Sequence, residues 1–174
     1  DLHLCDRRQR QMCIRDSLRL MKGVVDVYLA DFKYASALEA GKLSHASRYP
    51  EIALAAIEEM VAQVPVWEED DEGLLLKGVI VRHLVLPGRV EESKRALAVL
   101  HECFGDNVRL SIMSQYTPLA SGLERYGLAG RVTEEEYEEV LDYADSLGIE
   151  DYFWQQGDAA QESFVPDFNG EGVR

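Results

Sequence analysis

The sequence has few cysteines and no long apolar run, and each shortage excludes a class of protein. Cysteine occurs only at Cys5, Cys13 and Cys103 in 174 residues, too rarely and too unevenly for a disulfide framework. These thiols fit a reducing compartment. No apolar stretch approaches the roughly 18 residues of a membrane-spanning helix, and the first residues lack the apolar core of a secretory signal. We therefore expect a cytoplasmic protein.

Positive charge is also scarce, because the formal net charge is −14. A nucleic acid or an anionic membrane surface requires a basic face on its protein partner, so we expect neither as a partner. His45 and His101 are isolated, and no Cys/His cluster has the spacing of a zinc or iron site. The acidic runs at 68–72 and 134–139 lack the ligand spacing of a calcium loop and are interpreted as a solvated turn and a capped helix.

The first seventeen residues, DLHLCDRRQRQMCIRDS, show neither helical nor strand periodicity. They resemble translated adapter read-through, and we interpret 1–17 as a non-native tail; a genuine disordered tail is the alternative. The amphipathic pattern begins abruptly at about Leu18. On this interpretation Cys5 and Cys13 carry no function, and the N-terminal part of the protein is missing.

From residue 18 onward, apolar strands alternate with amphipathic helices. Strands are predicted at 24–32, 74–86 and 108–116, and helices at 50–61, 90–104 and 134–147. Pro50 suits a first helical turn, Gly105 a helix end, and Thr133 with Glu136 forms a capping box. The stretch from Tyr152 onward shows little regular period. This order indicates parallel β/α units with helices on both faces of the sheet. Three strands do not close a barrel, so the pattern predicts the C-terminal half of a larger β/α barrel or open α/β sheet.

Polar side chains come late in all three predicted strands. Asp31 and Lys33 share one face at the end of the first strand, Arg82 lies late in the second, and Gln115 and Tyr116 end the third. Parallel β/α folds bind their ligands beyond the carboxyl ends of the strands, so these residues are candidates for a binding site.

Each candidate has a structural alternative. Asp31 and Lys33 could contact a ligand or form a salt bridge, and Arg82 could hold a carboxylate bidentately or pair with an acidic loop. Gln115 and Tyr116 could bind a ligand or the surrounding loop. His83 lies on the face opposite Arg82 and is predicted to pack against a helix. The sequence contains no catalytic triad, P-loop, GxGxxG or HExxH motif, and we assign no catalytic residue.

Four segments in order, DVYLADFKYAS, VIVRHLVLPG, LSIMSQYTPLA and ESFVPDF, resemble the C-terminal half of radical SAM proteins of the pyruvate formate-lyase activating enzyme type, and especially their PflX-like branch. The resemblance extends from about residue 18 to residue 173. It implies a partial (β/α)6 barrel with parallel strands and flanking helices. It also implies a [4Fe-4S] cluster on a CxxxCxxC loop and S-adenosylmethionine, which is cleaved reductively to a 5′-deoxyadenosyl radical.

The resemblance also suggests roles for the candidate residues. Asp31 and Lys33 would contact the ribose or amino-acid end of S-adenosylmethionine and the substrate side, and Arg82 would bind its carboxylate. Gln115 and Tyr116 would face the substrate, although their residue types differ from the activase pattern. The partner implied by better-known relatives is a protein substrate such as a glycyl radical enzyme.

The sequence departs from this family in one large respect, because CxxxCxxC and the glycine-rich motif for the S-adenosylmethionine amino group are both absent. Cys5 and Cys13 have the wrong spacing to replace the cluster ligands, and Cys103 falls in a predicted helix. Since a cluster needs several thiolates, this chain is expected not to assemble one and to be inactive alone. We therefore interpret 18–174 as the C-terminal part of a radical SAM domain.

Two other functions fit parts of the sequence. A lysine at a strand end beside an aspartate could form a Schiff base with a carbonyl substrate, so Lys33 could serve an aldolase-type barrel enzyme. Alternatively, the acidic runs at 68–72 and 134–139 could make the chain a non-catalytic module that recognises a basic protein.

Overall fold

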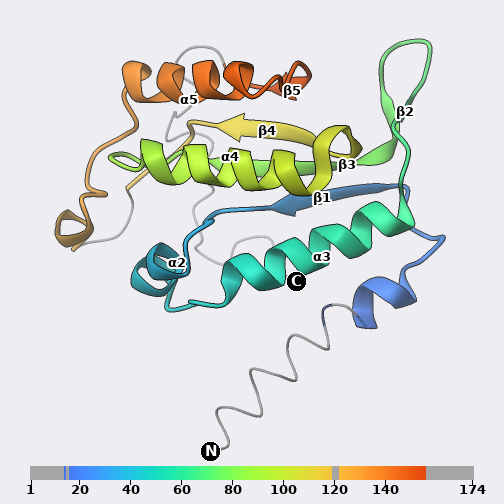
Figure 1. The fold of residues 1–174 in the computed structure, drawn as a ribbon, viewed down its shortest axis with the longest axis horizontal. Helices are drawn as coiled ribbons and strands as arrows, with labels where there is room; N and C mark the ends of the chain where they lie inside the picture. The colour runs from blue at the N-terminus through green and yellow to red at the C-terminus, as the bar shows by residue number, and fades with distance from the viewer. Residues whose placement is uncertain (1–13, 15, 119–121, 156–174) are drawn as a thin grey trace, which may run out of the picture.

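A parallel β-sheet forms the centre of the fold in a computed structural model, which describes residues 14, 16–118 and 122–155. Its strands are β1 (Val27–Asp31), β3 (Leu75–Leu84), β4 (Arg109–Met113) and β5 (Tyr152–Phe153), in that spatial order (Figure 1). The short β2 (Glu68–Glu69) pairs antiparallel with the start of β3. The predicted α/β class with parallel strands and flanking helices is therefore confirmed, and the three predicted strands are present but shorter.

Helices connect the strands and end where local sequence signals place them. They are α2 (Ala37–Ser44), α3 (Tyr49–Gln63), α4 (Val90–Phe104) and α5 (Glu134–Ser146), with short 3-10 turns at Gly105–Asn107 and Glu124–Tyr126. Ser36 caps α2 through its side chain, and Thr133 and Glu136 form the predicted capping box of α5. Gly148 adopts a positive φ of 78° just beyond α5, as expected of a helix stop.

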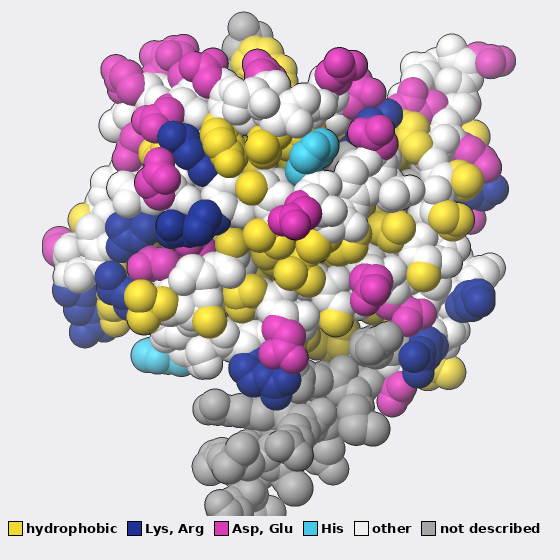
Figure 2. Space-filling view, viewed as in Figure 1, with side chains coloured by type: hydrophobic (Ala, Val, Ile, Leu, Met, Phe, Trp, Pro, Cys, Tyr) yellow, Lys and Arg dark blue, Asp and Glu magenta, His cyan; other side chains and the backbone are white. Residues whose placement is uncertain are grey.

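The hydrophobic core lies between one face of the sheet and the helices. Alternate residues of each strand contribute to it, and α3, α4 and α5 cover them; the buried side chains include Tyr28, Phe32, Val79, Val81, Leu110, Ile112, Ile57, Leu97, Leu100 and Val140. In Figure 1, α4 passes in front of the strands. Figure 2 shows apolar side chains between α3 and α4, where partly buried residues of both helices flank the core. The core thus belongs to one side of the sheet.

The opposite face of the sheet is bare within the described residues, which corrects the expectation of helices on both faces. Val27 and Leu29 of β1 are exposed, and Ile80, Arg82 and Leu84 of β3 are only partly buried. None of these side chains joins the core. The strands are apolar on both faces, a pattern typical of strands with helices on both sides of the sheet. The sequence pattern therefore could not reveal that the described helices all pack on one side.

A helical segment also precedes β1. Residues 16–20 are helical, and Leu18 is buried in the core, where its carbonyl oxygen accepts a hydrogen bond from Gln63 Nε2 of α3 at 2.9 Å. Of the predicted tail, residues 1–13 and 15 lie outside the described residues. Among the described helices, none has both the length and the apolar character needed to cross a membrane.

Candidate functional site

Asp31, Lys33 and Arg82 meet at the carboxyl ends of β1 and β3, and we call these three residues the edge group. Asp31 and Arg82 are direct register partners on the neighbouring strands. Nε of Arg82 donates to Oδ1 of Asp31 at 2.7 Å, and Nη2 lies 2.7 Å from the same oxygen. Nζ of Lys33 lies 3.6 Å from Oδ2. The structure therefore brings together the three residues predicted as cofactor-binding, and the partner of Arg82 is Asp31 rather than an acidic loop.

The edge group remains open to solvent. All three side chains are partly exposed, and Lys33 is the most exposed at 54%. Within the described residues Nη1 of Arg82 makes no hydrogen bond, so one side of the guanidinium is left for another acceptor. Two cations and one carboxylate leave a formal charge of about +1 here, although the chain carries −14. Exposed ion pairs contribute only about 0–1 kcal/mol to the free energy of unfolding, so the contacts within the edge group stabilise the fold little.

Side chains from three elements hold the backbone that carries Asp31 and Lys33. The hydroxyl of Tyr49, at the start of α3, donates to the Asp31 carbonyl at 2.8 Å and accepts from the Lys33 amide at 3.0 Å. Burial raises the pKa of Tyr49 above its ordinary value, so the hydroxyl keeps its proton. Carboxylate Oε1 of the buried Glu92, in α4, accepts from the Ala35 and Ser36 amides at 2.9 and 2.7 Å.

His83 is the third side chain that holds this backbone, and we call Tyr49, Glu92 and His83 the anchors. His83 faces the helices as predicted. Its side chain is 1% exposed, and Nδ1 lies 2.8 Å from the Phe32 carbonyl oxygen, so Nδ1 donates to that carbonyl. Burial lowers the pKa of His83, while the Phe32 carbonyl and the Glu92 carboxylate act in the opposite direction. The ring is therefore neutral, and its buried Nε2 has no partner among the described residues.

Sequence reasoning missed Tyr49 and Glu92 as anchors of the site. A signal existed for Glu92, because it falls on the same helical stripe as the buried Ala96 and Leu100 of α4. A carboxylate on a buried stripe requires donors, and the amides after β1 supply them.

The structure does not join Gln115 and Tyr116 to the edge group. Both follow β4, whose carboxyl end lies at the same edge of the sheet. The Tyr116 hydroxyl donates to the Leu128 carbonyl at 2.8 Å, which is the loop contact that the sequence left open as an alternative. Burial raises the pKa of Tyr116. Gln115 is exposed and makes no hydrogen bond within the described residues.

No described residues fit an iron–sulfur cluster. The only cysteine among them is the exposed Cys103 of α4, and no group of three or more His, Cys, Asp or Glu side chains in the described part could hold a metal ion. A cluster of this kind needs three or four thiolates, so no chemical step at such a cluster is assigned to this chain.

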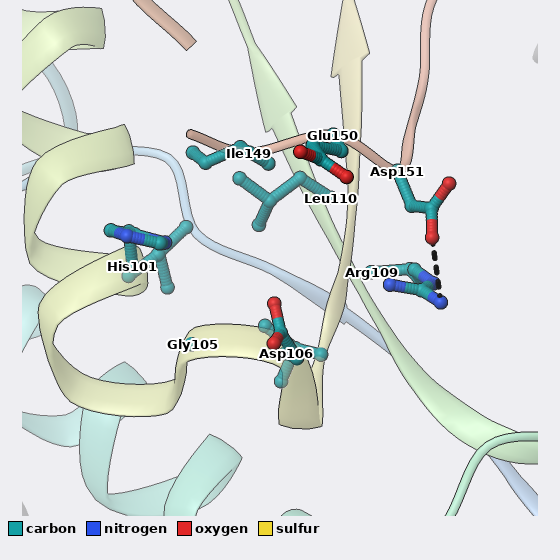
Figure 3. A pocket seen from close by; sticks show the side chains of 10 residues that line it. His101, Gly105, Asp106, Arg109, Leu110, Ile149, Glu150 and Asp151 are labelled. Atoms are coloured by element: carbon teal, nitrogen blue, oxygen red, sulfur yellow. Dashed lines mark ion pairs between the residues drawn. The ribbon is translucent and has the colours of Figure 1, made fainter. Parts of the chain in front are cut away.

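A shallow hollow at the other end of the sheet is a weaker candidate. It lies between the end of α4 and the segment before β5, and Figure 3 shows His101, Asp106 and Glu150 around it. Arg109 starts β4 and pairs with Asp151 at 2.9 Å, which places the hollow at the amino ends of the strands. Its volume of about 20 Å³ accommodates little more than water.

Comparison with known proteins shows similarity to one uncharacterized protein. No family model matches this chain. Over 135 residues, or 78% of this chain, it is 29% identical to an uncharacterized protein of the archaeon Methanocaldococcus jannaschii. The match covers 36% of that protein, so the chain spans about a third of the length of this relative.

Proposed function

We propose that the chain is the C-terminal part of a radical SAM enzyme of the pyruvate formate-lyase activating type, PflX-like branch, and that its edge group binds the amino-acid end of S-adenosylmethionine. The observation that carries this proposal is the meeting of Asp31, Lys33 and Arg82 at the carboxyl edge of a parallel sheet. Ligands of parallel β/α folds bind at this edge.

The chemistry of the edge group suits that ligand. The amino-acid end of S-adenosylmethionine carries a carboxylate, to which the free side of the Arg82 guanidinium can donate a charge-assisted hydrogen bond. Asp31 orients the guanidinium and offers a carboxylate oxygen to the ribose or the amino group. Lys33 is exposed beside them and faces the substrate side.

The one-sided cover of the sheet supports the partial barrel in this proposal. In a β/α barrel the helices lie outside and the other face of the sheet lines the interior, whereas an open doubly wound sheet has helices on both faces. The bare face here carries the side chain of Arg82 among apolar neighbours such as Leu29 and Ile80. Only binding is assigned to this chain, and a glycyl radical enzyme as substrate rests on the resemblance alone.

The test is S-adenosylmethionine binding, measured by calorimetry on a longer form of the chain that carries its upstream sequence. Arg82→Ala is expected to weaken binding at least about tenfold, as loss of a charge-assisted contact requires, and Arg82→Lys to restore part of it. Arg109→Ala is the matched control, because Arg109 is also a strand arginine paired with an aspartate but starts β4, at the opposite end of the sheet. Equal affinity of the Arg82→Ala variant and the parent protein would refute the assignment.

The two alternative functions find less support in the geometry. A Schiff-base lysine is activated by burial in an apolar pocket, and Lys33 is instead exposed and paired with a carboxylate. The acidic runs are partly engaged within the chain: Glu68 pairs with Lys77, Glu139 with Lys94, and Glu136 caps α5. They offer a basic partner fewer free charges than the sequence suggests.

A further inference from the structure

One ring atom of His83 has a hydrogen-bonding capacity that the anchors do not use. Nδ1 donates to the Phe32 carbonyl at 2.8 Å, so in the neutral ring Nε2 is an acceptor. The residue is 1% exposed, and Nε2 has no partner among the described residues. Buried polar atoms are almost always paired, either with protein or with ordered water. Nε2 therefore requires a donor.

A small pocket adjoins both His83 and the edge group. Nδ1 and Nε2 lie on opposite sides of the imidazole ring, so Nε2 points away from the Phe32 carbonyl. The pocket has a volume of about 10 Å³, and its polar lining consists of Lys33, Tyr34, Glu39, His83, Arg89, Glu92 and Ser93. We call it the His83 pocket. All three polar residues that the described part of the chain buries line this pocket: His83, Glu92 and Ser93.

The volume of the His83 pocket restricts what it can hold. A cavity of roughly 10–15 Å³ accommodates one water molecule, so this pocket has room for a water and for no organic ligand. The charged groups of the lining also leave no demand for an ion, because each is paired with an opposite charge: Lys33 with Asp31, Arg89 with Glu39, and Glu92 with Arg95. A neutral, polar occupant fits best.

Ser93 supplies a second partner for a water molecule. Ser93 lies in the first turn of α4 and is 2% exposed, and its hydroxyl makes no hydrogen bond within the described residues. A buried water makes about three hydrogen bonds. Here it would donate to Nε2 of His83 and accept from the Ser93 hydroxyl, and the Glu92 carboxylate in the same lining could accept its second hydrogen.

We propose that the His83 pocket binds one internal water molecule, which joins Nε2 of His83 to the hydroxyl of Ser93. This water would complete the anchor at the Phe32 carbonyl, and Phe32 lies between Asp31 and Lys33 of the edge group. Ser93 is thereby a positioning residue that touches no ligand. The inference concerns the interior of the chain and does not rest on the ligand proposed for the edge group.

Nuclear magnetic resonance on the present chain tests the proposal at neutral pH. The ring protons of His83 are expected to show cross-relaxation with a water molecule that stays bound for longer than the protein takes to tumble. The ring nitrogen shifts are expected to show Nε2 as an acceptor. His45, which is exposed at the end of α2, is the control and is expected to show no long-lived water. Absence of such a water at His83, or a proton on Nε2, would overturn the proposal.

A pair of serine variants tests the role of Ser93. Ser93→Ala removes one partner of the water and is expected to speed the exchange of the His83 Nδ1 proton about fivefold, as loss of one hydrogen bond requires. The water signal at His83 is expected to weaken as well, which a general loss of stability would not produce. Ser146→Ala is the matched control, because the Ser146 hydroxyl donates to the Tyr143 carbonyl at the exposed end of α5. Equal exchange and an equal water signal in the Ser93→Ala variant and the parent chain would overturn the proposal.

None of these measurements involves a ligand. Failure of S-adenosylmethionine binding would therefore leave the internal water site standing, and failure of the water site would leave the ligand assignment of Arg82 to its own test.

Discussion

At the scale of single residues, Glu92 shows how the site is held in place. Its side chain is almost fully buried, and its two carboxylate oxygens have different partners: Oε1 accepts from the Ala35 and Ser36 amides, and Oε2 from the Arg95 guanidinium. The carboxylate therefore fixes the turn after Lys33 to the first turn of α4. A contact of this kind supports the edge group without touching a ligand.

Replacement of this carboxylate is expected to be costly. Glu92→Ala leaves two amides without their acceptor, and we expect it to lower the free energy of unfolding by about 3 kcal/mol in urea titrations. Glu91→Ala is the matched control, because Glu91 is exposed and, in the described part of the chain, pairs with Lys94 alone; its loss is expected to cost less than about 0.5 kcal/mol. Similar effects of the two substitutions would show that Glu92 is not an anchor.

His83 is expected to make stability depend on pH. Burial lowers the pKa of His83 in the folded state below the ordinary value of 6.5, so below that pH the unfolded chain binds more protons than the folded one. The stability from the neutral ring is fully present above pH 6.5 and declines as the pH falls toward the lower, folded-state pKa. His83 lines a small pocket at the carboxyl edge of the sheet, and the charged groups that line it as well are Glu92, Glu39, Arg89 and Lys33.

The measurement is the free energy of unfolding between pH 7.5 and 5.5. His83→Asn keeps a donor for the Phe32 carbonyl but does not titrate, so it is expected to flatten the pH dependence, whereas His101→Asn on α4 is expected to preserve it. An unchanged slope in the His83→Asn variant would mean that other groups cause the decline.

At the scale of elements, the stability of α5 depends on the capping contacts of its first turn. Thr133 accepts from the Glu136 amide, and Oε2 of Glu136 accepts from the Thr133 amide, while Oε1 accepts from the Gly88 amide at 2.7 Å. The same glutamate thus caps α5 and attaches the loop after β3 to it. Both contacts lie at the carboxyl edge of the sheet.

Thr133→Ala is expected to lower the free energy of unfolding by about 1 kcal/mol, because it removes the side-chain cap. Glu138→Ala, an exposed substitution in the same helix, is expected to change it by less than about 0.5 kcal/mol. Thermal or urea unfolding measures both. Equal stability of the Thr133→Ala variant and the parent chain would show that the cap contributes nothing to α5.

The elements also show what sequence alone could reveal. The ends of α4 and α5 follow from local signals such as Gly105 and the capping box, and the edge group follows from the alternation of side chains along β1 and β3. β5 was missed because two residues are too few to show a period. The helical stripe of α4 indicates that Glu92 is buried, but it does not identify the partner amides, which lie up to 57 positions away in the sequence.

At the scale of the whole molecule, the bare face and the bare edge of the sheet meet in β1. Leu29 belongs to both, and Asp31 of the edge group follows two positions later. Within the described residues β1 pairs only with β3, so its other edge has no strand beside it. The segment that presents Asp31 therefore depends on the Tyr49 hydroxyl and the Glu92 carboxylate for its position.

The parallel register also restricts the order in which the molecule can assemble. β1 pairs with β3 only when Arg82, 51 positions after Asp31, has been reached, whereas β3 and β4 are joined by α4 and the short turn Gly105–Asn107. Closing the longer loop costs more chain entropy, so we expect the β3–α4–β4 unit to form before β1 pairs with it. During synthesis on the ribosome, the residues of β1 would therefore emerge early and remain without a pairing partner from this chain until β3 had followed.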